Sequence, residues 1–300
     1  MKIQTKRLLF AVCLFFTVNA NACDVCGGVN SALGLGTGAQ GNRTLFGLNF
    51  SHRSYTSTSH SLLGTHSSTF EQFNRLEVIA QVKISEKWQL KGTFVYSDAL
   101  QLSEEKNVNM RISGIGDASI STNYFIADNV DSTGNKSFRW SIGLGVKLPT
   151  GKFTTPHSDS MIIAPGTGSF DALAQSNILF RYKEWSFINE IQFGLPFQNK
   201  YEHRRGISLN TSMYAMRKVG EFGIFGGVQV SFNGTDYISG ARNSASVMNS
   251  FLVLPTIGTI YKAGDFVFQG NFQKPIWQTI ADGHVKQNFA FTLSAIYLLN

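Results

Sequence analysis

The end of the chain shows the clearest pattern of hydrophobic and polar positions. From Phe289 to Leu299 the side chains alternate between two faces, and one face is wholly apolar and aromatic. A side-chain period of two is that of a β-strand. We therefore expect this segment to be the last strand of the fold, with its apolar face set against either a protein core or lipid.

The same alternation recurs along most of the chain. It predicts twelve strands, each about the nine to eleven residues that a tilted strand needs to cross a bilayer. Their approximate bounds are Thr44 to Arg53, Arg75 to Ile84, Trp88 to Tyr96, Gly116 to Ile126, Phe138 to Leu148, Phe170 to Tyr182, Trp185 to Leu195, Ile207 to Arg217, Phe222 to Phe232, Phe251 to Tyr261, Phe266 to Gln273 and Lys286 to Leu299.

The connections between these segments alternate in length. Turns such as Lys183-Glu184 and Lys218 to Glu221 are very short. Long polar loops are expected at Ser54 to Asn74, Ser97 to Ile115, Pro149 to Ser169, Pro196 to Gly206, Asn233 to Ser250 and Lys274 to Val285. Short periplasmic turns and long extracellular loops are typical of outer-membrane barrels. The sequence therefore predicts an all-β, up-and-down antiparallel barrel of about twelve strands with both termini in the periplasm.

The two faces of the predicted strands differ in chemistry. The outward positions are apolar, and aromatic residues follow or precede the short turns, as in the girdle at a lipid boundary: Trp88, Tyr182, Trp185, Phe222, Tyr261 and Phe266. The inward positions carry many polar residues, among them Lys91, Arg139, Gln175, Asn177, Gln192, Gln269, Asn271 and Gln273. A dry core would not accept these groups unpaired, so we expect a polar or watered lumen. Pro255 falls within the tenth strand and suggests a bulge or a shifted boundary.

Composition and the N-terminus set the cellular context. Residues 1–22 have the basic start, apolar stretch and small-residue cleavage pattern of a signal peptide. Its removal takes away three basic residues and lowers the net charge from +7 to +4, which is too mild to argue for a nucleic-acid partner. Residues 23–43 form a Gly-rich segment, and residues 44–300 form the barrel. We expect export to the outer membrane of a Gram-negative bacterium.

Three short motifs carry a family resemblance. They are Gly114 to Ala118, Gly143 to Gly151, and Pro165 to Asp171. The region from Gly114 to Tyr182 resembles the outer-membrane barrel family called "MetA-pathway of phenol degradation", which is related in style to channels for hydrophobic compounds. The resemblance implies an outer-membrane protein that moves small, apolar or aromatic compounds. From the residues alone, these glycines and prolines are explained by loop architecture.

The predicted inward charges are the candidate site residues. Asp117 and Asp171 open strands near the exterior mouth, and Lys147 lies near the end of the strand between them. Arg181 and Glu190 also point inward. These residues are candidates for a charged constriction of the lumen, while pairing that stabilises the barrel wall is the alternative and the more common use of such charges.

The N-terminal segment holds a Cys-x-x-Cys pair, Cys23 and Cys26. In an exported chain this pair indicates a local disulfide, a lipid anchor at Cys23 or a soft-metal site. The Cys-Asp-Val-Cys opening resembles that of short outer-membrane barrel proteins from Bacteroidota. The pair alone does not decide among these alternatives, because a structural metal site needs four ligands.

The function that the sequence predicts is a passive channel or transporter for small solutes. Its partners are outer-membrane lipid and the solute; no cofactor is expected, and the oligomeric state is open. The alternative is a structural or interaction barrel that moves no solute, linked to metal handling through the Cys-x-x-Cys pair. We expect no enzyme, because His52 and Ser54, the nearest Ser/His arrangement, have no third polar residue assigned beside them.

Overall fold

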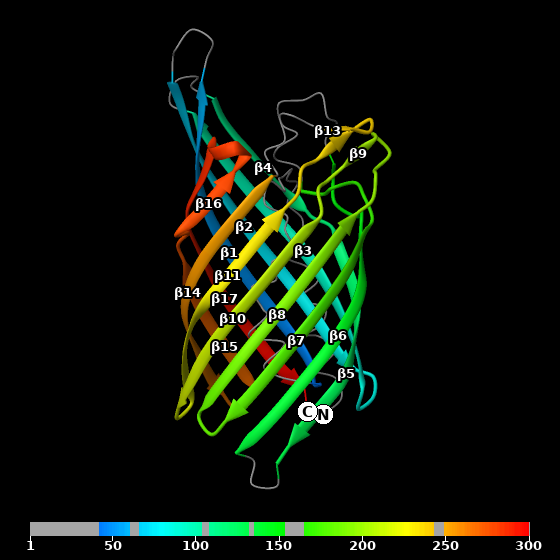
Figure 1. The fold of residues 1–300 in the computed structure, drawn as a ribbon, viewed down its shortest axis with the longest axis vertical. Helices are drawn as coiled ribbons and strands as arrows, with labels where there is room; N and C mark the ends of the chain where they lie inside the picture. Colours follow the sequence, from blue (N-terminus) through cyan, green and yellow to red (C-terminus); the bar gives the residue numbers. More distant parts are fainter. Residues whose placement is uncertain are drawn as a thin grey trace, which may run out of the picture.

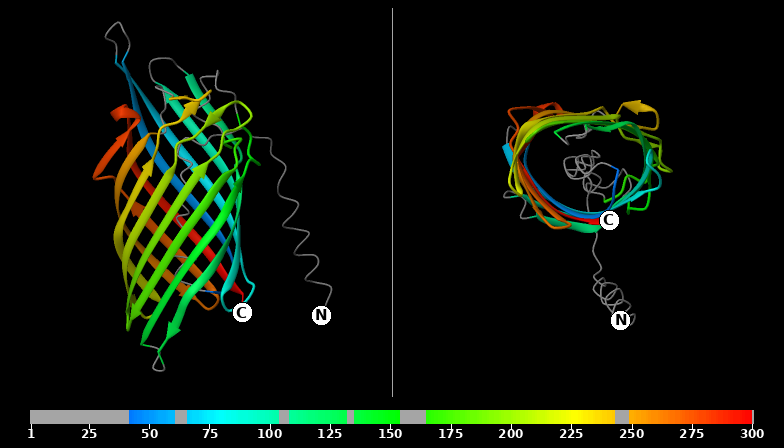
Figure 2. Two further views of the ribbon diagram at one scale, coloured as in Figure 1. Left: turned by 45° about the vertical axis from the view of Figure 1, so that its right-hand side comes forward. Right: turned by 90° about the horizontal axis from the view of Figure 1, so that it is seen from below.

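The computed structural model describes residues 42–60, 66–103, 108–131, 135–153, 165–242 and 249–299. These residues form a closed antiparallel barrel of twelve strands, as the alternation predicts. Figure 1 shows the strands tilted around one axis, and the view along that axis in Figure 2 shows the closed ring. In this part of the chain no helix has both the length and the apolar character to cross a membrane.

The barrel wall follows the order of the sequence, because each strand pairs with the next one along the chain. Its twelve strands are β1 (Thr44–His60), β2 (His66–Lys83), β3 (Trp88–Ser103), β5 (Ala118–Val130), β6 (Lys136–Leu148), β7 (Asp171–Tyr182), β8 (Trp185–Pro196), β10 (Ser208–Val219), β11 (Phe222–Asn233), β14 (Ser250–Ala263), β15 (Phe266–Gln273) and β17 (Val285–Leu299).

The terminal strand β17 closes the barrel. It pairs with β1 from Thr44 opposite Leu299 to Ser57 opposite Val285, and the register shifts at Ser54. Along β17 the inward side chains are buried and the outward ones are at least partly exposed, so that Ile296 and Leu298 face the interior while Tyr297 faces outward. The predicted alternation of this strand is therefore confirmed, and its apolar face is the outer surface of the barrel.

The predicted aromatic girdle forms at the end of the barrel that carries the short turns. Tyr182 lies opposite Trp185, and Phe222 stacks on Tyr261 with ring centroids 4.6 Å apart. Their side chains are more than a third exposed, as are Trp88, Phe266 and Tyr297. Rings in this position suit the boundary between lipid and water. We therefore take this end as the periplasmic end.

The predicted loops need correction, because several of them are strands. β1 and β2 continue pairing to His60 opposite His66. The segment expected as a loop after Tyr96 is a hairpin of β3 with β4 (Val108–Ile115). Further short strands lie within the other external connections: β9 (His203–Arg204), β12 (Tyr237–Ile238), β13 (Ala241–Arg242) and β16 (Trp277–Ile280). The polar composition of these segments hid them, because strands above the membrane have no lipid face to make apolar.

Pro255 lies inside β14 without shifting that strand's pairing with β11. The irregularity lies on the neighbouring side. Gln273 pairs with Thr256 and Trp277 pairs with Val253, which leaves three residues between these pairs on the β15–β16 side and two on β14. The predicted bulge therefore falls on the strand beside the proline, where β15 ends and β16 begins.

Candidate functional site

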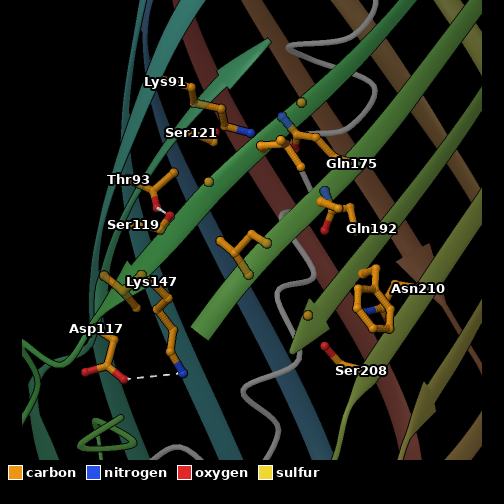
Figure 3. A pocket seen from close by; sticks show the side chains of 18 of the residues that line it. Lys91, Thr93, Asp117, Ser119, Ser121, Lys147, Gln175, Gln192, Ser208 and Asn210 are labelled. Atoms are coloured by element: carbon orange, nitrogen blue, oxygen red, sulfur yellow. Dashed lines mark hydrogen bonds and ion pairs between the residues drawn. The ribbon is translucent and has the colours of Figure 1, made fainter. Parts of the chain in front are cut away.

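The candidate site is the interior of the barrel, whose wall carries most of the buried polar groups. One pocket on this wall is lined by residues from β2, β3, β5, β6, β7, β8 and β10. Figure 3 shows Lys91, Ser121, Gln175 and Gln192 pointing into this space. A lumen ringed by amide, hydroxyl and charged side chains differs from the dry core of a soluble sandwich.

Three of the predicted site residues meet at the external end of the wall. The Nζ atom of Lys147 lies 2.6 Å from Oδ2 of Asp171 and 3.6 Å from Oδ2 of Asp117. Asp117 also accepts hydrogen bonds from the Gly151 N–H and from both the N–H and the Oγ1–H of Thr167, at 2.6 to 2.9 Å. All three charged side chains are at least nine-tenths buried. One buried carboxylate therefore holds two returning segments of chain.

These contacts explain the three sequence motifs. Thr150 Oγ1 accepts a hydrogen bond from the Ala118 N–H and donates one to the Gly116 carbonyl. Ser169 Oγ donates to Asp171. We call the group Asp117, Lys147, Thr167, Ser169 and Asp171 the rim cluster. The motifs lie far apart in sequence but surround this single cluster.

A bulge between β4 and β5 places Asp117. Tyr96 pairs with Ile115 and Thr93 with Ser119, so three residues stand on the β4–β5 side opposite two on β3. The extra residue bends the strand at Gly116-Asp117, and bulges of this kind re-aim a side chain.

Close backbone contact completes the arrangement of the rim. A Cβ added at Gly166 would lie 2.5 Å from the backbone of Gly151. Only glycine fits at this contact, which is a physical reason for the glycines in two of the motifs.

The rim cluster continues into a second polar group on the neighbouring loops. Asn199 Nδ2 donates to the Thr167 carbonyl, and Asn199 Oδ1 accepts from the His203 N–H. His203 Nε2 lies 3.2 Å from Asp236 Oδ2, and its ring stacks on Phe153. Sequence reasoning missed this group. Its residues stand in segments without periodicity, and the Gly-Thr-Gly-Ser motif before Asp171 was the only available signal.

Glu190 belongs to a different part of the lumen. Its carboxylate and that of Glu77 interact electrostatically with the ammonium of Lys91. Arg75 Nη2 lies 2.6 Å from Glu77 Oε1, and Asn49 donates to the other oxygen of Glu77. Among the described residues, Glu190 is therefore an electrostatic neighbour of Lys91 and forms no ion pair with the rim cluster.

Several buried polar atoms of the lumen have no partner within the described residues. They are Oε1 of Glu190, Nδ2 of Asn210 and both amide atoms of Gln269. Buried polar groups are normally hydrogen-bonded, to water where protein offers no partner. These atoms therefore indicate positions for water or solute in the lumen.

Apolar side chains line the lumen near the periplasmic end. Two buried clusters lie within a few residues of the short turns, and Ile260 packs against both of them. We call these residues the apolar layer: Leu45, Ile79, Leu179, Ile188, Tyr214, Met216, Phe225, Ile260, Val267, Ile296 and Leu298. On β3 and β5 the wall has the polar side chains of Gln89 and Asn123 instead, which are hydrogen-bonded to each other.

The remaining candidates lie apart. Arg181 stands below the apolar layer at the periplasmic mouth, where it lines a cavity of about 540 Å³. His52 Nδ1 contacts Asn74, whereas Ser54 Oγ accepts from Asn288, so these two side chains have separate partners. Cys23 and Cys26 fall outside the described residues, within which no group of three or more His, Cys, Asp or Glu side chains could hold a metal ion.

Solved structures of outer-membrane proteins resemble this fold. The COG4313 outer membrane channel from Pseudomonas putida F1 superposes with a TM-score of 0.65 at 11% identity, over 86% of this chain and 96% of that chain. The chain folds as an outer-membrane β-barrel. More distant barrels include the translocator domain of autotransporter NalP from Neisseria meningitidis (TM-score 0.43, 10% identity, 98% of this chain and 94% of that chain) and the CymD monoaromatic hydrocarbon channel (TM-score 0.42, 8% identity, 94% and 95%).

Sequence comparisons add less. The family model described as "LptD: LPS transport system D" matches residues 20–154, which is less than half of the chain. No curated protein matches the chain. The solved structures are too distant in sequence to give more than the fold.

Proposed function

We propose that the protein is an outer-membrane channel for the passive movement of small solutes. A closed barrel of twelve strands encloses more room than side chains fill in an eight-stranded one. The similar Pseudomonas barrel is an outer membrane channel, which supports this role.

The observation that carries the proposal is the set of buried polar atoms without protein partners. Glu190, Asn210 and Gln269 come from β8, β10 and β15, and each leaves at least one polar atom without a hydrogen bond within the described chain. Leaving such atoms dry costs about 1–3 kcal/mol each. A watered interior removes that cost and provides a path for solute.

The apolar layer supports a preference for solutes with an apolar body. A solute that crosses from the interior of the lumen to the periplasm passes the partly buried side chains of Tyr214, Met216 and Ile260, which offer contact surface but few hydrogen bonds. The family resemblance of the central motifs points to the same class of compound. Small aromatic or otherwise hydrophobic molecules are therefore the proposed cargo.

The predicted site residues take different parts in this proposal. The rim cluster supports the external mouth, because its charges are paired with one another. Glu190 and Lys91 place two buried titratable side chains on the wall of the lumen. Arg181 supplies charge at the exit.

Liposome swelling tests the proposal with a matched pair of variants on β11. Phe225 is buried in the apolar layer, whereas Phe232 on the same strand faces outward. In refolded protein we expect uptake of small neutral solutes, faster uptake for Phe225→Ala because the lumen is widened, and an unchanged rate for Phe232→Ala.

Two results would contradict the channel. One is the absence of solute flux and of single-channel steps in planar bilayers for both the wild type and Phe225→Ala. The other is equal flux through protein-free liposomes. Either result, in protein shown to be folded by its heat-dependent gel mobility, would favour a structural or interaction barrel.

A further inference from the structure

The periplasmic aromatic girdle carries a group of cations on the outer surface of the barrel. The group lies on the neighbouring strands β6, β7, β8 and β10 and on the turn between β7 and β8, and these strands stand side by side in Figure 1. We call it the cation–ring patch, and its members are Lys136, Tyr182, Lys183, Trp185 and Arg217. All five residues are exposed.

The cations of this patch lie over the faces of its rings. The Nζ atoms of Lys136 and Lys183 are each 5.6 Å from the centre of the Tyr182 ring. The guanidinium carbon of Arg217 is 5.7 Å from the centre of the Trp185 ring. Contacts at these distances are cation–π interactions. They hold the positive groups at the level of the girdle, where lipid headgroups lie.

The ring contacts leave the N–H groups of these cations available. Within the described parts of the chain, Lys136, Lys183 and Arg217 form no ion pair and no side-chain hydrogen bond. An ammonium has three donors, and a stacked guanidinium keeps the donors along its edge. Lys136 and Arg217 lie outside the cavity at the periplasmic mouth, whereas Lys183 also borders it.

The turn between β7 and β8 places Lys183 in a conformation that lysine rarely adopts. Its φ is 53°, in the left-handed region that glycine and asparagine enter more easily. The Lys183 N–H donates to the Asn135 carbonyl at 2.7 Å, which ties this turn to the neighbouring β5–β6 connection. The turn therefore brings a second ammonium to the ring that Lys136 already contacts.

Apolar rings continue the surface toward the middle of the bilayer. Phe180 and Phe187 lie opposite each other on β7 and β8, two residues from Tyr182 and Trp185, and their rings stack with centroids 6.5 Å apart. Both side chains are exposed on the outer surface of the barrel. Positive groups at the headgroup level thus stand directly beside apolar rings at the level of the acyl chains.

We propose that the cation–ring patch binds an anionic phospholipid of the periplasmic leaflet. Lys136 and Lys183 receive the phosphate, Arg217 adds to the positive potential, and the acyl chains pack on Phe180 and Phe187. The excess of basic groups favours a headgroup with a net negative charge over a zwitterionic one, whose own cation the patch repels. The site lies on the outside of the barrel, so it does not depend on solute passing through the lumen.

Native mass spectrometry tests the site on the full-length protein in a neutral detergent. The protein is titrated separately with phosphatidylglycerol and with phosphatidylcholine of the same acyl chains. We expect phosphatidylglycerol to bind about tenfold more tightly, because both lipids carry a phosphate but only phosphatidylglycerol has a net negative charge. The masses of the complexes give the number of lipids bound to each barrel.

The variants separate a defined site from general attraction of anions. Lys136→Gln should weaken phosphatidylglycerol about fivefold and leave phosphatidylcholine nearly unchanged, since a basic residue at a membrane surface contributes about that factor. Adding Lys183→Gln should remove most of the preference. Lys87→Gln is the matched control, because Lys87 lies over the Tyr124 ring of the same girdle at 6.0 Å, without a second described cation on that ring. It should leave both affinities nearly unchanged.

Equal affinity for the two lipids would overturn the site, as would equal losses in Lys136→Gln and Lys87→Gln. A dimer that dissociates in Lys136→Gln and carries no lipid would assign the patch to a second copy of the chain and reject the lipid. Heat-dependent gel mobility shows whether each variant is folded, and Lys136→Arg, which keeps the charge, should keep the preference. The measurement involves no flux, so its failure and the failure of the channel are distinguishable.

Discussion

The external rim and the periplasmic mouth of this barrel use charge in opposite ways. At the rim, Asp117, Lys147 and Asp171 are buried and neutralise one another, and backbone and hydroxyl groups satisfy the remaining oxygens. At the mouth, the exposed side chains of Lys218 and Lys262 line an open cavity beside solvent. The same residue types therefore hold the chain together at one end and are available to a solute at the other.

The connecting segments explain the difference. On the periplasmic side the turns are short, so the strand ends define the mouth and their side chains stay at the surface. On the external side the chain returns over the wall, and Gly151 and Gly166 meet in backbone contact. Burial there makes every polar group depend on a partner, because an unpaired buried charge is costly.

The largest expected effect is the loss of a buried carboxylate at the rim. Asp117→Ala leaves Lys147 with one partner and removes the acceptor for Thr167 and Gly151, and we expect a loss of about 3–5 kcal/mol in unfolding free energy. Urea titration in lipid vesicles measures it. The control is Asp128→Ala, which breaks the partly exposed pair with Arg139 and should cost about 0–1 kcal/mol. Equal losses would mean that the rim is no more dependent on pairing than the exposed wall.

A smaller effect is expected from adding one methyl group at the rim. In Gly166→Ala the new Cβ meets the backbone of Gly151, and we expect a loss of about 1–3 kcal/mol from overpacking. Gly92 on β3 has nothing within 4 Å of such a Cβ. Gly92→Ala should therefore change the unfolding free energy by less than about 0.5 kcal/mol in the same titration. A tolerant Gly166 would show that the two returning segments can separate.

The smallest effect is expected at the mouth. A unit charge about 10 Å from an ion in water contributes about 0.4 kcal/mol, which is about a twofold change in local ion concentration. Lys218→Gln should therefore shift the reversal potential in a salt gradient toward cation permeation near 0.1 M salt, and the shift should vanish near 1 M, where the Debye length is about 3 Å. Arg217→Gln removes the neighbouring charge, which lies over the ring of Trp185 outside the cavity at the periplasmic mouth, and should shift it less. No difference between the two variants would place the ion path away from this cavity.

The strands and their faces could be predicted because both depend on neighbours in sequence. The alternation in β11 and β17 gives the inward and outward sets directly. Above the membrane the alternation is lost, because β4 and the outer parts of β1 and β2 are strands without a lipid-facing side. Their polar composition predicts loops, since the apolar signal of a strand comes from lipid contact and not from strand pairing.

The sequence by itself determined that this chain is a barrel, since a period of two is a local property of each strand. Only the tertiary structure decided which charges meet. Thr167 bonds to Asp117 across 50 residues, whereas Glu190, on the strand after Asp171, interacts electrostatically with Lys91 on β3. The reason is physical: register, strand tilt and the returning external segments set distances between strands, and no single strand carries that information.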